Sequence, residues 1–243
     1  MKQLGLKIIQ LDTVDSTNNF AANLLSMGEL AHGTVIMADE QTKGRGQRGS
    51  KWVTQPAMNL TASFFVQYDN LAVSKQMMIN QWISLVIIDM LKKHKISGKI
   101  KWPNDIFVND QKIAGILIEN QLSQNKVKSS IIGIGLNVNQ VDFGDLNATS
   151  IKQHTQNFIP VNEILMQLIE SLNRLLKFII EEDVTRLKEL YLLSLWKLNE
   201  EISCTVNGET TLVKILGTSD FGLLLMEIDG KEKEFDLKEI QFL

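Results

Sequence analysis

The sequence has a single cysteine, Cys204, and therefore cannot form a disulfide within the chain. A protein that does without disulfides suits a reducing compartment, so we expect it in the cytoplasm. Cys204 falls in a predicted strand, where a thiol is usually buried as a small apolar side chain. We therefore assign Cys204 to the core and give it no chemical role.

Long apolar runs, internal repeats and low-complexity tracts are also missing. The N-terminal segment MKQLGLKIIQLD lacks the long uncharged core of a signal peptide, and no stretch approaches the roughly 18 uninterrupted apolar residues of a membrane helix. The chain has 243 residues, of which 44% are hydrophobic and 22% are charged. These values are typical of a globular protein with one large domain, or one large and one small, and no membrane association.

An excess of positive charge is absent as well, because the net charge is −3. General nucleic-acid-binding proteins are usually basic, so we expect no nucleic-acid partner. Cations are instead concentrated in residues 39–52, DEQTKGRGQRGSKW, which we call the glycine loop. It interleaves three glycines with four cations, namely Gly44, Gly46, Gly49, Lys43, Arg45, Arg48 and Lys51.

The glycine loop has the composition of an anion-binding turn. Glycine permits a positive φ and lets a ligand approach the backbone, whose successive amides can converge on an anion. Arginine adds planar contacts with phosphate or carboxylate, often through two hydrogen bonds. The loop therefore predicts an anionic, phosphorylated ligand. A basic surface loop and a loop for single-stranded RNA remain alternatives for this segment taken alone.

Hydrophobic periodicity predicts an α/β body. The expected strands are 7–11, 34–38, 58–66, 106–108, 111–122 and 126–138. One expected helix follows Thr17 and ends near Met27, three others span 74–95, 161–180 and 184–196, and residues 142–158 form a long loop. The buried stripe of helix 74–95 should consist of Met78, Trp82, Leu85, Ile88 and Leu91.

The pattern changes after Trp196 into short strand-like runs. These runs are 201–206, 211–216, 223–227 and 233–237. Asn207-Gly208 and Asp229-Gly230 lie between runs and indicate hairpin turns. We expect a small all-β barrel of about 45 residues that docks on the body, because so small a module is marginally stable alone.

A polar hairpin is predicted around the two-residue turn Asn109-Asp110. Counting back from this turn gives the pairs Val108–Gln111, Phe107–Lys112, Ile106–Ile113 and Asp105–Ala114. Asp105 and Lys112 then share one face as diagonal neighbours, within reach of each other or of one ligand. A lysine beside a carboxylate that could hold Mg²⁺ suits nucleotide chemistry, in which cations neutralise charge on the reacting phosphorus. A purely structural ion pair is the alternative.

Two other stretches allow two interpretations each. Ser16 and Thr17 precede a helix, where their hydroxyls are typical N-caps but could instead face a polar group of a ligand. Gly133 and Gly135 alternate within an apolar strand, which often marks close approach of a ligand or of another backbone.

Five motifs occur in the order seen in the biotin protein ligases, which the chain resembles over essentially its whole length. They are Asp15-Ser16-Thr17-Asn18, Gln41-Thr42-x-Gly44-Arg45-Gly46, Lys101-Trp102-Pro103-Asn104-Asp105, Lys112-Ile113-Ala114-Gly115-Ile116-Leu117 and Gly133-x-Gly135-x-Asn137. Lipoate ligases share the fold, but GRG together with KWPND resembles the biotin branch. The resemblance implies an α+β fold. Residues 1–196 would form a class II synthetase-like catalytic domain, with a mixed or antiparallel sheet flanked by helices, and residues 197–243 an SH3-like β-barrel.

The resemblance also implies an activity. Biotin and ATP would form biotinyl-5′-AMP with release of pyrophosphate, and Mg²⁺ would assist. A lysine of the biotin carboxyl carrier protein of acetyl-CoA carboxylase would then accept the biotin. Two alternatives stay open, namely a ligase for lipoate or another acyl acid, and a biotin-binding protein without catalysis.

Residue roles follow from the same resemblance. Lys112, Arg45 and Asp105 would be catalytic, with Asp105 also holding Mg²⁺. Biotin would contact Ser16, Thr17, Asn18, Gln41, Gly44, Arg45, Lys112 and Gly115. ATP and the adenylate would contact Gly46, Gln47, Arg48, Trp52, Lys101, Asn104, Asn137 and Asn139. The loop 142–158 resembles the segment that becomes ordered over the adenine in this family.

The chain departs from the family pattern in two respects. The family loop usually contains GRGRxGR, and here Gln47 and Ser50 replace two arginines. Gln47 can hydrogen-bond but carries no charge, so we expect weaker retention of biotinyl-AMP. Some members also carry an N-terminal winged-helix domain that represses transcription. Too few residues precede Asp15 for a DNA-reading module, so we expect a ligase without operator binding, acting as a monomer or weak homodimer.

Overall fold

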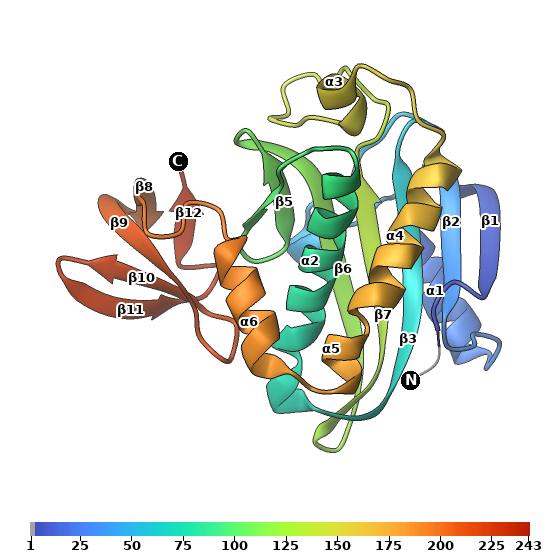
Figure 1. The fold of residues 1–243 in the computed structure, drawn as a ribbon, viewed down its shortest axis with the longest axis horizontal. Helices are drawn as coiled ribbons and strands as arrows, with labels where there is room; N and C mark the ends of the chain where they lie inside the picture. Colours follow the sequence, from blue (N-terminus) through green and yellow to red (C-terminus); the bar gives the residue numbers. More distant parts are fainter. Residues whose placement is uncertain (1–2) are drawn as a thin grey trace.

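The computed structural model describes residues 3–243, apart from the side chain of Arg48, and contains two β-sheets (Figure 1). The larger sheet has seven strands in the order β1-β2-β3-β7-β6-β5-β4. The first two strands are parallel and every other neighbouring pair is antiparallel. The strands are β1 (Lys7–Val14), β2 (Thr34–Gln41), β3 (Leu60–Ala72), β4 (Lys99–Lys101), β5 (Asp105–Val108), β6 (Gln111–Ser123) and β7 (Lys126–Leu136).

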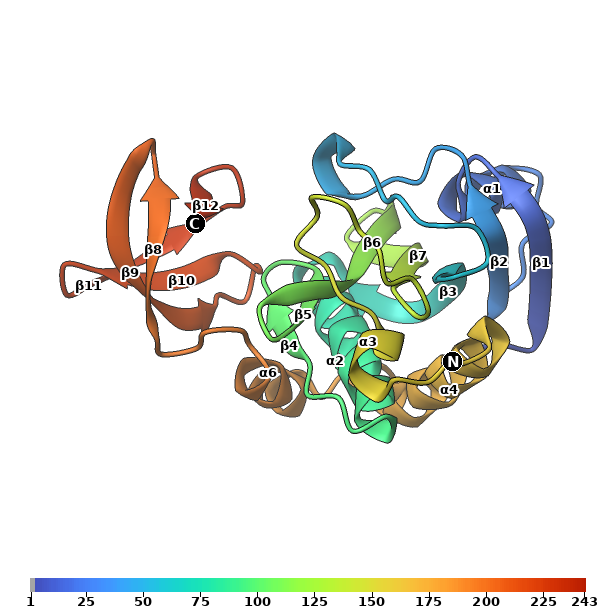
Figure 2. The same cartoon turned by 90° about the horizontal axis from the view of Figure 1, so that it is seen from above.

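Helices cover both faces of this sheet, which confirms the predicted α+β class. They are α1 (Thr17–Ser26), α2 (Met77–Lys93), α3 (Ile151–Thr155), α4 (Val161–Leu175), α5 (Lys177–Ile180) and α6 (Val184–Leu193), with 3₁₀ turns η1 (Gln47–Gly49) and η2 (Val73–Lys75). Figure 2 shows α2, α4 and α6 together on one side of the sheet. Alternation along β2 sends Val35 and Met37 into the core under these helices, and Ile36 into a smaller core under α1. None of the described helices combines the length and apolar character needed to cross a membrane.

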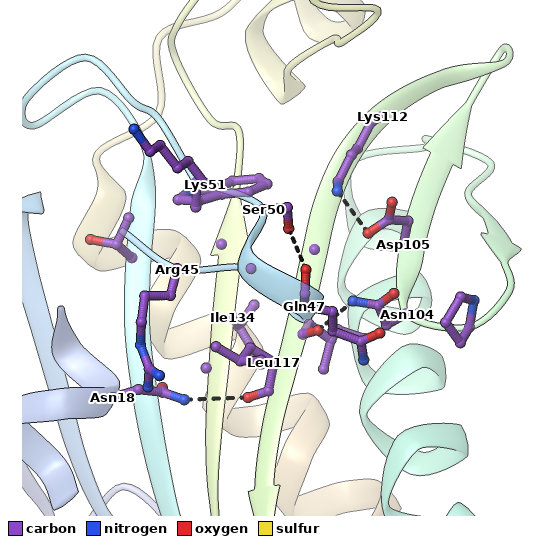
Figure 3. Close-up of a pocket in the computed structure, with 18 of the residues that line it drawn as sticks. Asn18, Arg45, Gln47, Ser50, Lys51, Asn104, Asp105, Lys112, Leu117 and Ile134 are labelled. Carbon is purple, nitrogen blue, oxygen red and sulfur yellow. Dashed lines mark hydrogen bonds and ion pairs between the residues drawn. The ribbon is translucent and has the colours of Figure 1, made fainter. Parts of the chain in front are cut away.

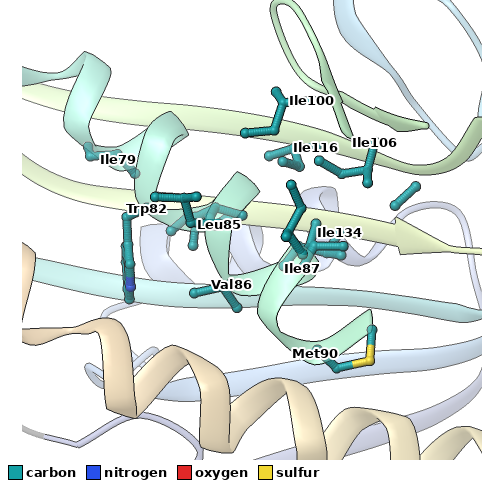
Figure 4. Packing of buried hydrophobic residues seen from close by; sticks show 14 of the residues in the cluster. Ile79, Trp82, Leu85, Val86, Ile87, Met90, Ile100, Ile106, Ile116 and Ile134 are labelled. Atoms are coloured by element: carbon teal, nitrogen blue, oxygen red, sulfur yellow. The ribbon is translucent and has the colours of Figure 1, made fainter. Parts of the chain in front are cut away.

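The central helix α2 supplies the largest share of the core (Figure 4). Its predicted stripe of Met78, Trp82, Leu85, Ile88 and Leu91 is buried, as expected. The helix begins at Met77, three residues later than predicted, because Val73–Lys75 forms the separate turn η2. This core holds the edge of the sheet that carries β4, β5 and β6 in a fixed position.

The smaller sheet is antiparallel, with the order β11-β10-β9-β8-β12. Its strands are β8 (Glu201–Val206), β9 (Glu209–Thr218), β10 (Leu224–Ile228), β11 (Lys231–Phe235) and β12 (Ile240–Phe242). Both residues of each predicted turn, Asn207-Gly208 and Asp229-Gly230, have positive φ, as tight hairpins of this kind require. The sequence did not predict β12, which is three residues long.

The structure also corrects the local predictions at the polar hairpin, in the predicted helix 161–180 and in the predicted loop 142–158. The turn Asn109-Asp110 forms, and the two pairs nearest to it are as predicted, but a β-bulge then shifts the register, so that Ile106 pairs with Ala114 and Asp105 with Gly115. The predicted helix 161–180 is interrupted at Leu176 and forms α4 and α5. The predicted loop 142–158 contains α3, whose first turn is closed by a Ser150–Gln153 capping box.

Candidate functional site

A cavity of about 330 Å³ lies where the glycine loop crosses the strands β5, β6 and β7 (Figure 3). Leu237, in the turn between β11 and β12, and Phe242 of β12 complete its wall. The predicted site residues in its lining are Ser16, Thr17, Asn18, Gln41, Arg45, Gly46, Gln47, Trp52, Lys101, Asn104, Asp105, Lys112 and Gly115. The fold therefore brings together motifs that lie far apart in the sequence.

Three predicted residues do not line the cavity. Gly44 is buried, and a Cβ there would lie 2.3 Å from the backbone oxygen of Trp52. The side chains of Asn137 and Asn139 instead hold backbone, through hydrogen bonds of 3.0 Å to the Thr149 oxygen and 2.7 Å to the Ile159 oxygen. These two residues fix the segment that follows β7, and their predicted contact with the adenylate stays a prediction. The side chain of Arg48 lies outside the described residues.

One end of the cavity is a polar network at the start of α1. The Thr17 amide and hydroxyl both donate to Gln41 Oε1, at 2.8 and 3.1 Å. Ser63 Oγ lies 2.7 Å from Thr17 Oγ1 and 2.5 Å from Asn18 Oδ1. Ser16 occupies the N-cap position, but its hydroxyl makes no capping hydrogen bond. Capping therefore does not account for the Ser16 hydroxyl, which is buried in the lining.

Glu119 on β6 connects this network to the glycine loop. Arg45 donates to both carboxylate oxygens of Glu119, at 2.8 and 2.9 Å, and Asn18 Nδ2 donates to Oε2 at 2.8 Å. Sequence reasoning missed both Glu119 and Ser63. The alternation of side chains along β6 was the available signal for Glu119, because it stands two residues after Leu117, which lines the cavity.

Trp52 lies against the floor of the cavity, above two glycines that pair across β6 and β7. A Cβ on Gly135 would be 2.3 Å from the indole ring, and a Cβ on Gly115 would be 3.3 Å from it. Gly133 makes room for Asn18 in the same way, at 2.5 Å. The close approach predicted from these glycines is thus made by side chains, not by another backbone. The Trp52 Nε1 atom is buried without a hydrogen-bond partner.

The other end of the cavity carries the predicted lysine–carboxylate pair. Lys112 Nζ is 2.8 Å from Asp105 Oδ1, so the expected proximity is confirmed although the bulge changes the register. Lys101 stands opposite Asp105 across β4 and β5. Burial lowers the pKa of Lys101, and the nearby Asp105 carboxylate partly opposes that shift.

Positive charge dominates the cavity. Arg45, Lys51, Lys101 and Lys112 line it, and Asp105 is the single carboxylate among the described lining residues. No group of three or more His, Cys, Asp or Glu that could hold a metal ion occurs in the described part of the chain. The residues present therefore do not form a metal site held by the protein alone, and they are suited to anionic ligands.

The profile of the biotin/lipoate A/B protein ligase family matches residues 11–137. The chain belongs to this family. The bifunctional ligase/repressor BirA of Bacillus spizizenii is 30% identical over 245 residues, which is 98% of this chain and 74% of that protein. The biotin--[acetyl-CoA-carboxylase] ligase of Mycobacterium tuberculosis is 31% identical over 150 residues, which is 58% of this chain and 54% of that one.

Solved structures extend the family likeness to the whole fold. The biotin protein ligase from Aquifex aeolicus in complex with biotin and ATP superposes with a TM-score of 0.79, at 27% identity and with 98% of each chain covered. Its apo structure gives a TM-score of 0.71 at 25% identity, again over 98% of each chain. The likeness therefore includes the C-terminal sheet as well as the body.

Proposed function

We propose that this protein activates biotin with ATP to biotinyl-5′-AMP and transfers the biotin to a lysine of a biotin carboxyl carrier protein. The observation that carries the proposal is the cationic cavity, which has Arg45 at one end and Lys112 at the other. The chain that forms this cavity belongs to the ligase family. The biotin ligases among the relatives and the biotin- and ATP-bound structural neighbour support the choice of substrates.

The first step joins two anions. An oxygen of the biotin carboxylate attacks the α-phosphorus of ATP, the bond from that phosphorus to the bridging oxygen breaks, and pyrophosphate leaves. Lys112 is the residue we assign to the position between the carboxylate and the α-phosphate, because its ammonium group lies in the cavity and is held by Asp105. A fixed cation there offsets the repulsion of the reactants and the charge that builds up on phosphorus.

The second step forms an amide. The neutral amine of the acceptor lysine attacks the acyl carbon, the bond from that carbon to the phosphate oxygen breaks, AMP leaves, and the amine loses a proton. We assign the polar network of Thr17, Gln41 and Ser63 to the ureido end of biotin, which needs both donors and acceptors. Arg45 of the glycine loop would contact biotin, and Gly46 would contact the adenylate phosphate.

The finer parts of the proposal concern partners. We propose the carrier of acetyl-CoA carboxylase as the acceptor and a cytoplasmic location. Mg²⁺ would come bound to the phosphates of ATP, with Asp105 as its nearest protein carboxylate, because Mg²⁺ usually keeps few protein ligands.

The deciding experiment measures biotin-dependent exchange of labelled pyrophosphate into ATP, followed by transfer to a purified carrier domain. The wild type should exchange and transfer with biotin, and lipoate should not replace biotin. Lys112→Ala should abolish exchange, whereas Lys126→Ala, which removes an exposed lysine of β7, should leave it intact. Exchange with lipoate would favour the ligase for another acyl acid. Biotin binding without exchange would favour a binding protein without catalysis.

A further inference from the structure

The ammonium group of Lys101 is enclosed by three aromatic rings. Its Nζ atom lies 4.6 Å from the ring centroid of Phe107, 4.8 Å from that of Trp196 and 5.0 Å from that of Phe242. The rings also contact one another, with centroids 6.2 Å apart for Phe107 and Trp196 and 5.7 Å apart for Trp196 and Phe242. A cation over aromatic faces is attracted by their quadrupoles. We call these three rings the Lys101 cage.

Each ring of the cage is fixed by contacts that do not involve Lys101. Trp196 follows α6, where its amide donates to the Ile100 oxygen at 2.8 Å and its Nε1 atom donates to Asp110 Oδ1 at 2.6 Å. Phe107 is buried in β5. Phe242 is held in β12, opposite Cys204 of β8. The cage therefore joins the body, the segment after α6 and the C-terminal sheet.

The cage lies in the wall of the candidate site. Lys101 and Phe242 line the cationic cavity, and together with Phe107 and Trp196 they also line a second hollow of about 370 Å³ on the outer side. Lys101 and Lys112 stand on either side of Asp105, one through the β4–β5 pairing and the other through the ion pair. Figure 3 shows Lys112 and Asp105 at the opposite end of the cavity from Asn18 and Arg45.

We propose that Phe242 and Trp196 are positioning residues that hold the Lys101 ammonium group ready for the triphosphate of ATP. The C-terminal sheet then completes the ATP site, and this inference rests on the proposed function. A free lysine side chain has about 2 kcal/mol of rotamer entropy to lose on binding a phosphate. A lysine already oriented over rings loses less, and the rings hold its ammonium group without pairing it with an anion of their own.

If the Lys101 cage acts in this way, removing one of its rings should change the KM for ATP and not the KM for biotin. Phe242→Leu keeps an apolar side chain but removes the quadrupole, and it should raise the KM for ATP by roughly fivefold to tenfold in the exchange assay. The KM for biotin should not change, because biotin is assigned to the Thr17 end. Phe242→Tyr keeps the ring and should behave as the wild type. Phe221→Leu replaces an exposed phenylalanine in the turn between β9 and β10 and is the control.

The dependence of the Phe242→Leu effect on Lys101 distinguishes positioning of Lys101 from general packing between the body and the C-terminal sheet. Lys101→Met should itself raise the KM for ATP, and Phe242→Leu should add nothing further in that background. Equal effects on the two substrates would overturn the inference. A Phe242→Tyr variant with the same rise in the KM for ATP as Phe242→Leu would also overturn it. So would a Lys101→Met variant with an unchanged KM for ATP. A third contrary result is a full effect of Phe242→Leu in the Lys101→Met background. A wild type that shows no biotin-dependent exchange would instead refute the proposed function.

Discussion

At the scale of single residues, Glu119 links two parts of the cavity that come from distant motifs. Its carboxylate binds Arg45 of the glycine loop and Asn18 of α1 at the same time. Both contacts orient groups that we assign to biotin. An ion pair with this much exposure contributes modestly, up to about 1 kcal/mol, so its value lies in orientation more than in stability.

Glu119→Gln should therefore weaken biotin binding without unfolding the protein. The amide keeps the shape but loses the charge that holds Arg45, so the KM for biotin should rise by up to roughly fivefold and the KM for ATP should stay constant. Glu189→Gln, which removes an exposed ion pair with Arg186 on α6, is the control. If both variants have the KM values of the wild type, Glu119 does not position the biotin site.

The glycines of β7 have a packing role that can be measured directly. Gly135→Ala would place a methyl group 2.3 Å from the Trp52 ring, so the indole has to leave the floor of the cavity. We expect a loss of unfolding free energy of about 1–3 kcal/mol in urea titrations. The loss should largely disappear in a Trp52→Ala background, where the ring is absent. An equal loss in both backgrounds would place the clash elsewhere.

The residues of the site were predictable where a local pattern or a family motif carried them. Asp105 and Lys112 follow from a two-residue turn and a period of two, and the bulge did not separate them. Ser63, Glu119 and Phe242 were missed, because their roles depend on which strand lies beside which and on how the C-terminal sheet docks. Alternation along β6 indicates the face on which Glu119 lies, but no spacing within the chain shows that Arg45 and Asn18 reach it.

At the scale of elements, the glycine loop carries the expected departure from the family pattern, at Gln47 and Ser50. Gln47 opens η1 and lines the cavity, and Ser50 Oγ donates to its backbone oxygen at 2.8 Å. An arginine at position 47 could add a charged hydrogen bond to the adenylate phosphate. Charged hydrogen bonds contribute about 1.5–3 kcal/mol and neutral ones about 1 kcal/mol.

Gln47→Arg should therefore slow the dissociation of biotinyl-5′-AMP by roughly fivefold or more. Release is measured by stopped-flow displacement and by labelling of an unrelated protein, which should fall in the variant. Gln67→Arg adds the same charge at an exposed position of β3 and should change neither quantity. Unchanged release in Gln47→Arg would mean that the wild-type loop already holds the adenylate as firmly.

The elements themselves were predicted best where the sequence pattern was long or where turn chemistry was specific. The stripe of α2 and the paired positive-φ residues of the two C-terminal hairpins are examples. Strands of three residues, such as β4 and β12, contain too few positions to show a period. The parallel pairing of β1 with β2 depends on the path of the chain through α1, which local propensity does not determine.

At the scale of the whole molecule, a shared apolar core and specific polar contacts join the two sheets. Buried residues of the C-terminal sheet, including Cys204 and Met226, belong to the same continuous apolar core as Trp82 of α2. Trp102 Nε1 donates to the Gly222 oxygen at 2.8 Å, and Lys188 forms an ion pair with Asp220 at 2.7 Å. The turn between β9 and β10 is thus fastened to the body.

A shared core predicts a single cooperative unfolding transition, although the C-terminal sheet is small enough to be marginal alone. Cys204, the one cysteine of the chain, is buried in that sheet and reports on it through its reactivity with a thiol reagent. In urea, the midpoint for Cys204 labelling should coincide with the midpoint for tryptophan fluorescence, to which Trp82 in the body contributes. A cysteine placed at the exposed position 212, in Cys204→Ser/Leu212→Cys, should react at every urea concentration. Labelling of Cys204 well below the fluorescence transition would show that the C-terminal sheet opens first, and the wall of the ATP site that contains Phe242 would then open with it.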